Sequence, residues 1–77
     1  MTTKQIIENK INDLERKIRV DRDYMDNALE QIQNGVNNID YCKKLIEQYD
    51  FSKEQISKFE NDLKLLKLAI KAIEENK

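Results

Sequence analysis

The sequence contains no proline and no histidine, and it has one glycine and one cysteine. Without proline, and with glycine only at Gly35, little interrupts helix formation, so we expect an all-α fold. The absence of histidine argues against imidazole metal sites and nucleophile–histidine pairs, and no glycine-rich phosphate loop is present. Carboxylates are plentiful, but a pair of helices offers no pocket to raise the pKa of one of them. We therefore expect no catalytic activity, cofactor or metal in this chain.

No charge of one sign dominates, because the net charge is -1. Bulk attraction to nucleic acid is therefore not expected. No apolar run approaches the roughly 20 residues needed to span a bilayer, and the N-terminal residues lack the apolar core of a signal peptide. Together with the unpaired Cys42, these features predict a cytoplasmic protein. The richness in Lys, Ile and Asn suits an AT-rich genome, such as that of a low-GC bacterium or its phage.

Apolar residues recur at helical spacing through the first part of the chain. A heptad count that starts at Ile11 places an apolar residue at every first position, in the series Ile11, Ile18, Met25, Ile32, Ile39 and Ile46. The fourth positions are weaker, since they include Asp21 and Gly35. A seven-residue repeat of this length predicts a helical seam with coiled-coil character. Asp21 is either a buried polar residue that sets the register or a locally exposed one.

The phase of this repeat is the same before and after Gly35, so we predict one continuous helix over residues 3–48. The alternative is a break at residues 34–38. Asn34-Gly35 is a turn dipeptide, and glycine is the usual residue just past a helix end.

A second boundary is predicted at residues 49–52. Ser52 and Gln55 have the spacing of a capping box, in which Ser52 is the N-cap, and Phe51 and Ile56 have the spacing of a hydrophobic staple. A second helix is therefore expected over residues 53–75. Its apolar residues alternate in steps of three and four, and a second set widens the apolar arc beyond one neighbour: Leu65, Leu68, Ala69 and Ala72.

These boundaries predict a single domain over residues 1–77, folded as a long-and-short antiparallel helical hairpin. Helices of about 70 Å and 35 Å would leave the start of the first helix uncovered. We therefore expect the chain to dimerise into a helical bundle, with a compact three-helix bundle, broken near residues 34–38, as the alternative. The uncovered stripe is the predicted self-association or partner surface, and it consists of Ile7, Ile11, Leu14 and Ile18.

The leading functional hypothesis is a non-catalytic protein-interaction module. It would be a small regulator, inhibitor or assembly adaptor, of phage or mobile-element origin, that binds through an apolar helical stripe. Tyr41 lies off the predicted seam and is a candidate contact residue, or else a tyrosine lying over a helix edge. One alternative is a dimeric nucleic-acid-binding regulator that uses the basic cluster Arg16, Lys17, Arg19 and Arg22. Another is a membrane-surface protein that uses the amphipathic segment 63–73.

Overall fold

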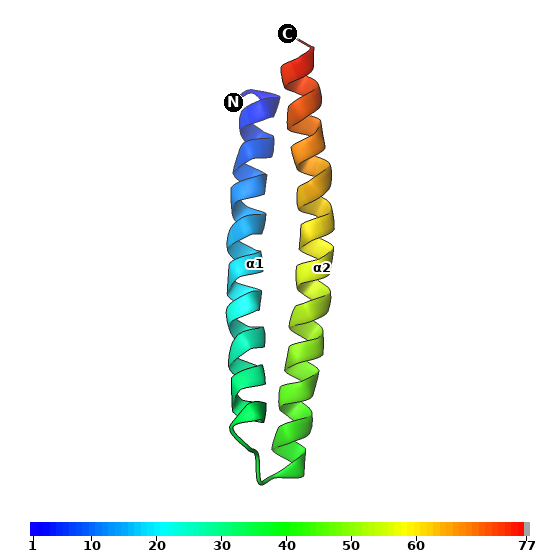
Figure 1. Cartoon of the computed structure of the whole chain (residues 1–77). Helices are drawn as coiled ribbons and strands as arrows, with labels where there is room; N and C mark the ends of the chain where they lie inside the picture. Colours follow the sequence, from blue (N-terminus) through cyan, green and yellow to red (C-terminus); the bar gives the residue numbers. More distant parts are fainter. Residues whose placement is uncertain (77) are drawn as a thin grey trace.

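The computed structural model describes residues 1–76 and consists of two long helices joined by one turn (Figure 1). Helix α1 spans Thr3–Gln33 and helix α2 spans Ile39–Glu75. The helices run antiparallel, so both termini lie at one end of the rod and the turn lies at the other. The prediction of an all-α helical hairpin is confirmed, and the three-helix alternative is not supported, since residues 1–76 form two helices and no strand.

Both helices begin at a side-chain cap. The Thr2 hydroxyl accepts a hydrogen bond from the Gln5 amide at 3.1 Å, and Gln5 Oε1 accepts one from the Thr2 amide at 3.0 Å. This reciprocal pair is a capping box. At the start of α2, Asn38 Oδ1 accepts from the amides of Asp40 and Tyr41 at 2.9 and 3.2 Å. Each cap satisfies amides that the first helical turn would otherwise leave without partners.

The predicted continuous helix over residues 3–48 is wrong, because α1 ends at Gln33. The last amides still bond backward, from Asn34 to the Glu30 carbonyl and from Gly35 to the Ile32 carbonyl. Gly35 then adopts a φ of +93°, which no other residue type takes up at so little cost. The chain leaves the helix at this glycine, and Asn38 starts the next one.

The predicted turn at residues 49–52 is also wrong, because this segment lies inside α2. Ser52 is not an N-cap: its side chain is buried, with 3% of its surface exposed. No residue of the segment is a glycine or proline, so nothing forces the backbone out of the helix. Ser52 instead takes its place on the side of α2 that faces α1, and Gln55, one turn further on, is half-buried within the same helix. A capping sequence permits a helix start, but burial of this side of the helix favours continuation.

The residues that face the other helix recur in steps of three and four along each helix. On α1 these seam residues, all buried or half-buried, are Lys4, Ile7, Ile11, Leu14, Ile18, Asp21, Met25, Ala28 and Ile32. On α2 they are Cys42, Leu45, Tyr49, Ser52, Ile56, Phe59, Leu63, Leu66, Ile70 and Ile73. This second series runs through residues 49–52 without a fault, which is the packing reason for an unbroken α2.

The heptad count across Gly35 is misleading because only one of its two series keeps its phase. Cys42 and Tyr49 remain on the seam, in step with Leu14 on α1 and Ile56 on α2. Ile39 and Ile46 of the other series do not, since 70% and 47% of their surfaces are exposed. After the turn, the positions that face the other helix are no longer those that the heptad count from Ile11 assigns. Periodicity alone could therefore not reveal the break.

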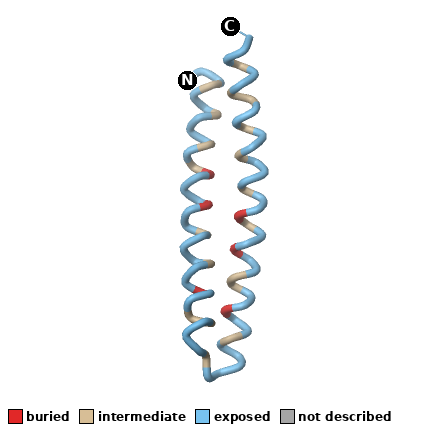
Figure 2. Tube along the Cα trace, in the orientation of Figure 1, coloured by how far each residue is buried: buried red, intermediate tan, exposed pale blue. Residues whose placement is uncertain are grey.

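Helices of 31 and 37 residues are nearly matched, at about 46 and 55 Å. The hairpin is therefore not long-and-short, and the rod measures 60 × 17 × 15 Å. Its apolar core is a thin line along the contact between the helices (Figure 2), made of Leu14, Ile18, Ala28, Leu45 and Ile56. A core this narrow leaves most large side chains partly accessible, and their distribution is where a function must be sought.

Candidate functional surface

One side of the hairpin is bridged by ion pairs, and we call it the salt-bridge side. Arg22 Nη2 lies 2.9 Å from Glu60 Oε1, and Lys67 Nζ lies 3.9 Å from Glu15 Oε1. These four residues each follow a seam residue by one position, so both pairs lie on the same side of the contact line. Because all four side chains are 46–60% exposed, the pairs select the register more than they stabilise the fold.

The opposite side is bridged by tyrosines and amides, and we call it the tyrosine side. The Tyr41 hydroxyl donates to Gln31 Oε1 at 2.6 Å, and Gln48 Nε2 donates to the Tyr24 carbonyl at 3.5 Å. Tyr24, Gln31, Tyr41 and Gln48 each precede a seam residue by one position, which places them across the hairpin from the ion pairs. The two sides of the rod therefore differ in chemistry.

Large apolar side chains are exposed along the tyrosine side, over both helices. Val20 and Tyr24 lie one turn apart on α1, and with Asp23 and Asn27 they line a shallow hollow. Phe51 and Leu65 lie two heptads apart on α2, whereas Leu68 borders the salt-bridge side, where it lines a hollow with Glu60 and Lys67. Four residues make up the long apolar face, and 48–61% of the surface of each is accessible: Val20, Tyr24, Phe51 and Leu65. The sequence indicated Leu65 and Leu68 as a second apolar arc, but not Val20 or Phe51.

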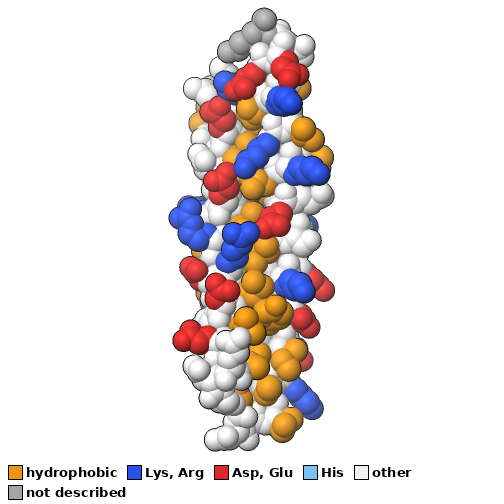
Figure 3. All heavy atoms as spheres, in the orientation of Figure 1, with side chains coloured by type: hydrophobic (Ala, Val, Ile, Leu, Met, Phe, Trp, Pro, Cys, Tyr) orange, Lys and Arg blue, Asp and Glu red, His pale blue; other side chains and the backbone are white. Residues whose placement is uncertain are grey.

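A smaller apolar group lies near the turn on the salt-bridge side. Leu29, Ile39 and Ile46 are 38%, 70% and 47% exposed, and we call them the turn patch. Leu29 occupies the heptad position of Arg22, and Ile39 and Ile46 occupy that of Glu60. Apolar residues thus replace the ion pairs toward the turn. The face drawn in Figure 3 shows this pattern, with charged side chains over its middle and hydrophobic ones gathered toward the turn end.

The predicted interface stripe lies between the helices of the same chain. Leu14 and Ile18 are 4% and 7% exposed, and Ile7 and Ile11 are half-buried. The premise that α2 is too short to cover them is wrong, because α2 reaches past the start of α1 (Figure 1). In the closed hairpin these side chains hold the helices together. Tyr41, by contrast, is 47% exposed, although its hydroxyl is engaged by Gln31.

Three of the four residues in the basic cluster are paired with acidic groups. Asp13 contacts both Arg16 and Lys17, with Lys17 Nζ at 3.2 Å from Asp13 Oδ2, and Arg22 contacts Glu60. Lys17 also lies 5.9 Å from the centre of the Phe59 ring. A hydrogen bond from Lys17, with further help from Arg16, lowers the pKa of Asp13 below its ordinary value of 3.8. Much of the charge of this cluster is therefore balanced locally.

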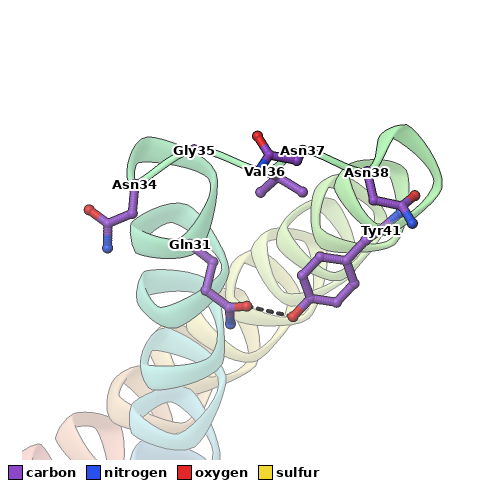
Figure 4. A pocket seen from close by; sticks show the side chains of 7 residues that line it. All are labelled: Gln31, Asn34, Gly35, Val36, Asn37, Asn38 and Tyr41. Carbon is purple, nitrogen blue, oxygen red and sulfur yellow. Dashed lines mark hydrogen bonds between the residues drawn. The ribbon is translucent and has the colours of Figure 1, made fainter.

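The turn forms a hollow lined by amides (Figure 4). Its lining residues are Gln31, Asn34, Gly35, Val36, Asn37, Asn38 and Tyr41, none of which is charged. In the close-up, the Tyr41 ring spans the gap between the helices and its hydroxyl meets Gln31. Asn38 is occupied as the cap of α2. The hollow offers hydrogen-bonding groups but no acid, base or nucleophile pair that would support catalysis.

Among residues 1–76, no group of three or more potential metal-ligating side chains comes together. Neither helix, over the same range, has a stretch long and apolar enough to cross a bilayer. Comparisons with protein-family models, with curated proteins and with solved structures found no match to this chain. The chemistry of the exposed surface is therefore the feature of this chain that bears on its function.

Proposed function

We propose that this chain is a non-catalytic protein-interaction module. It acts as a small regulator, inhibitor or assembly adaptor, of the kind encoded by phages and mobile elements, in the reducing environment of the cytoplasm. The observation that carries this proposal is that most of the exposed large apolar side chains lie in two groups on opposite sides of the rod. Exposed apolar groups of this kind are typical of interaction sites.

The turn patch is the proposed contact for a protein partner. Leu29, Ile39 and Ile46 flank the half-buried seam residues Ile32 and Cys42, so apolar surface continues across both helices near the turn. A helix of the partner that lies across this end would bury the three exposed side chains. Each would contribute up to about 1.5–3 kcal/mol if fully covered, before the costs of association.

Affinity capture from the native host, followed by mass spectrometry, tests this proposal. The bait variant Leu29→Asp with Ile46→Asp removes the turn patch, and the control Ser57→Asp with Asn61→Asp adds the same charge at exposed polar positions of α2. We expect a protein that both wild type and control retain and the turn-patch variant loses. The proposal would be contradicted by a partner that all three baits retain equally, or by the absence of any specific partner.

A further inference from the structure

We propose that the long apolar face binds a second copy of this chain in the antiparallel sense. Two hairpins would then form a four-helix bundle with a twofold axis across the middle of the rod. This inference goes beyond the proposed function, because it concerns another surface and another partner. The turn patch lies on the opposite side of the rod and would stay accessible in such a dimer.

The uneven distribution of charge along the rod favours binding of a second copy. It also favours the antiparallel orientation of that copy. The half of the hairpin next to the turn, residues 20–57, carries eight acidic and four basic side chains. The half next to the termini, residues 1–19 and 58–76, carries seven acidic and nine basic ones. The halves therefore have net charges of -4 and +2. An antiparallel pair places each acidic half against a basic half, whereas a parallel pair places like charges together.

The residues bordering the long apolar face show the same polarity. In the turn half the exposed charges on this border include the acidic residues Asp23, Glu30, Glu47 and Glu54. In the terminal half they include the basic residues Lys10, Arg16 and Lys17, two of which pair with Asp13, and the acidic residues Asp62 and Glu75. Lys58 lies on the face itself, one heptad from both Phe51 and Leu65. In a twofold antiparallel dimer through this face, α1 lies along α1 of the second copy and α2 along its α2. The acidic border of one copy then runs beside the nearly neutral border of the other copy's terminal half, whereas a parallel pair would place the two acidic borders together.

The positions of the largest apolar residues fit the same symmetry. Phe51 and Leu65 lie at nearly equal distances on either side of the middle of α2, which spans Ile39–Glu75. A twofold axis through that middle brings Phe51 of each copy to Leu65 of the other. Val20 lies close to the middle of α1, which spans Thr3–Gln33, and therefore meets its own copy near the axis. The apolar residues become self-complementary, as a twofold interface requires.

The available area is sufficient for a stable dimer. One side of a rod that measures 60 × 17 × 15 Å has a footprint of about 1,000 Å². A standard protein–protein interface buries about 800 Å² on each partner. Pairing along the whole length would also give every helix only antiparallel neighbours, the arrangement common in up-and-down bundles.

Sedimentation equilibrium tests the association. We expect wild type to be dimeric at tens of micromolar and its dissociation constant to rise severalfold between about 0.05 and 0.5 M salt, as screening weakens the contacts between halves. Phe51→Asp with Leu65→Asp should be monomeric with unchanged helicity, because both side chains are exposed in the single hairpin. The control Ser57→Asp with Asn12→Asp, at exposed polar positions away from this face, should remain dimeric. A wild type that is monomeric throughout, or a face variant that stays dimeric, would overturn the proposal.

Double electron–electron resonance between spin labels tests whether the two copies pack antiparallel or parallel. The label is placed at Asn37→Cys in the turn, in a Cys42→Ser background. An antiparallel dimer separates the two labels by about the 60 Å length of the rod. A parallel dimer brings them within about 10–20 Å, a distance set by the spacing of packed helices. A short distance would contradict the antiparallel arrangement. If the chain is monomeric but host capture still depends on the turn patch, this inference fails while the proposed function stands.

Discussion

The guanidinium of Arg22 lies 2.9 Å from the carboxylate of Glu60, across 38 positions of sequence. With Lys67 and Glu15, this pair connects the same heptad positions on the two helices. A slide of one helix by a single residue would separate both pairs and would also rotate the seam out of contact. The pair therefore reports which register the two helices adopt.

Reversing the Arg22–Glu60 pair should restore what either single reversal loses. Because the two side chains are 59% and 48% exposed, Arg22→Glu should cost no more than about 1 kcal/mol of unfolding free energy. Glu60→Arg should behave similarly, and the double variant should recover about 0.2–1 kcal/mol relative to the sum of the two losses. Urea melts of the four proteins measure this coupling. A coupling of zero would mean that the ion pair does not form in solution.

Gly35→Ala should destabilise the hairpin by about 1–2 kcal/mol, because an L-residue is strained at a φ of +93°. A Cβ added at Gly35 would meet no atom within 4 Å, so the cost is one of backbone strain alone. Asn37→Ala in the same turn, where φ is not positive, serves as the control and should change stability little. Thermal melts compare the two. An unchanged melting temperature for Gly35→Ala would place the turn elsewhere.

Capping variants distinguish the two possible helix starts. Asn38→Ala should cost about 1 kcal/mol, since it removes the acceptor for the Asp40 and Tyr41 amides. Ser52→Ala should cost nothing and could add a few tenths of a kcal/mol, because alanine has the higher helix propensity inside α2. Circular dichroism during denaturation measures both. The opposite order, with Ser52→Ala the more damaging, would support a helix start near residue 53.

Two apolar truncations in α2 should differ greatly in cost. Leu45 is 3% exposed, so Leu45→Ala should lose about 2–5 kcal/mol through the cavity it leaves. Ile39 is 70% exposed, so Ile39→Ala should stay within about 0.5 kcal/mol of wild type. Denaturant titration at low protein concentration avoids any contribution from association. Similar losses for the two variants would mean that Ile39 belongs to the core, as the heptad count suggests.

The carboxyl of Asp13 should titrate below its ordinary pKa of 3.8, because Lys17 donates to it and Arg16 lies beside it. A carboxyl group whose pKa is lower in the folded state stabilises the hairpin at pH values above its unfolded-state pKa. That contribution is lost as the pH falls through the folded-state value. Carbon-detected NMR titration of wild type and Lys17→Met measures the pKa of Asp13. The midpoint of Asp13 should rise toward 3.8 in Lys17→Met, and an unmoved midpoint would show that Lys17 is not its partner.

The composition and the apolar spacing of the chain determined its fold class. A chain with no proline and one glycine, with apolar residues in steps of three and four, can satisfy its backbone and bury its side chains only as long helices. The same spacing identified Leu14 and Ile18 as part of an apolar stripe, although it assigned them to a partner surface and not to the contact within the hairpin, and it left Leu65 and Leu68 outside a single seam. These features depend on local periodicity, which a sequence displays directly.

Tertiary structure decided which of two local signals becomes the turn. Asn34-Gly35 and Ser52 with Gln55 are both reasonable boundaries on local grounds. A turn at Gly35 lets two helices of nearly equal length bury Leu14, Ile18, Leu45 and Ile56 against each other. A turn at residues 49–52 would leave half of that seam without a partner in the same chain. The free energy of burial between distant residues made the choice, and that term appears only once the two helices are side by side.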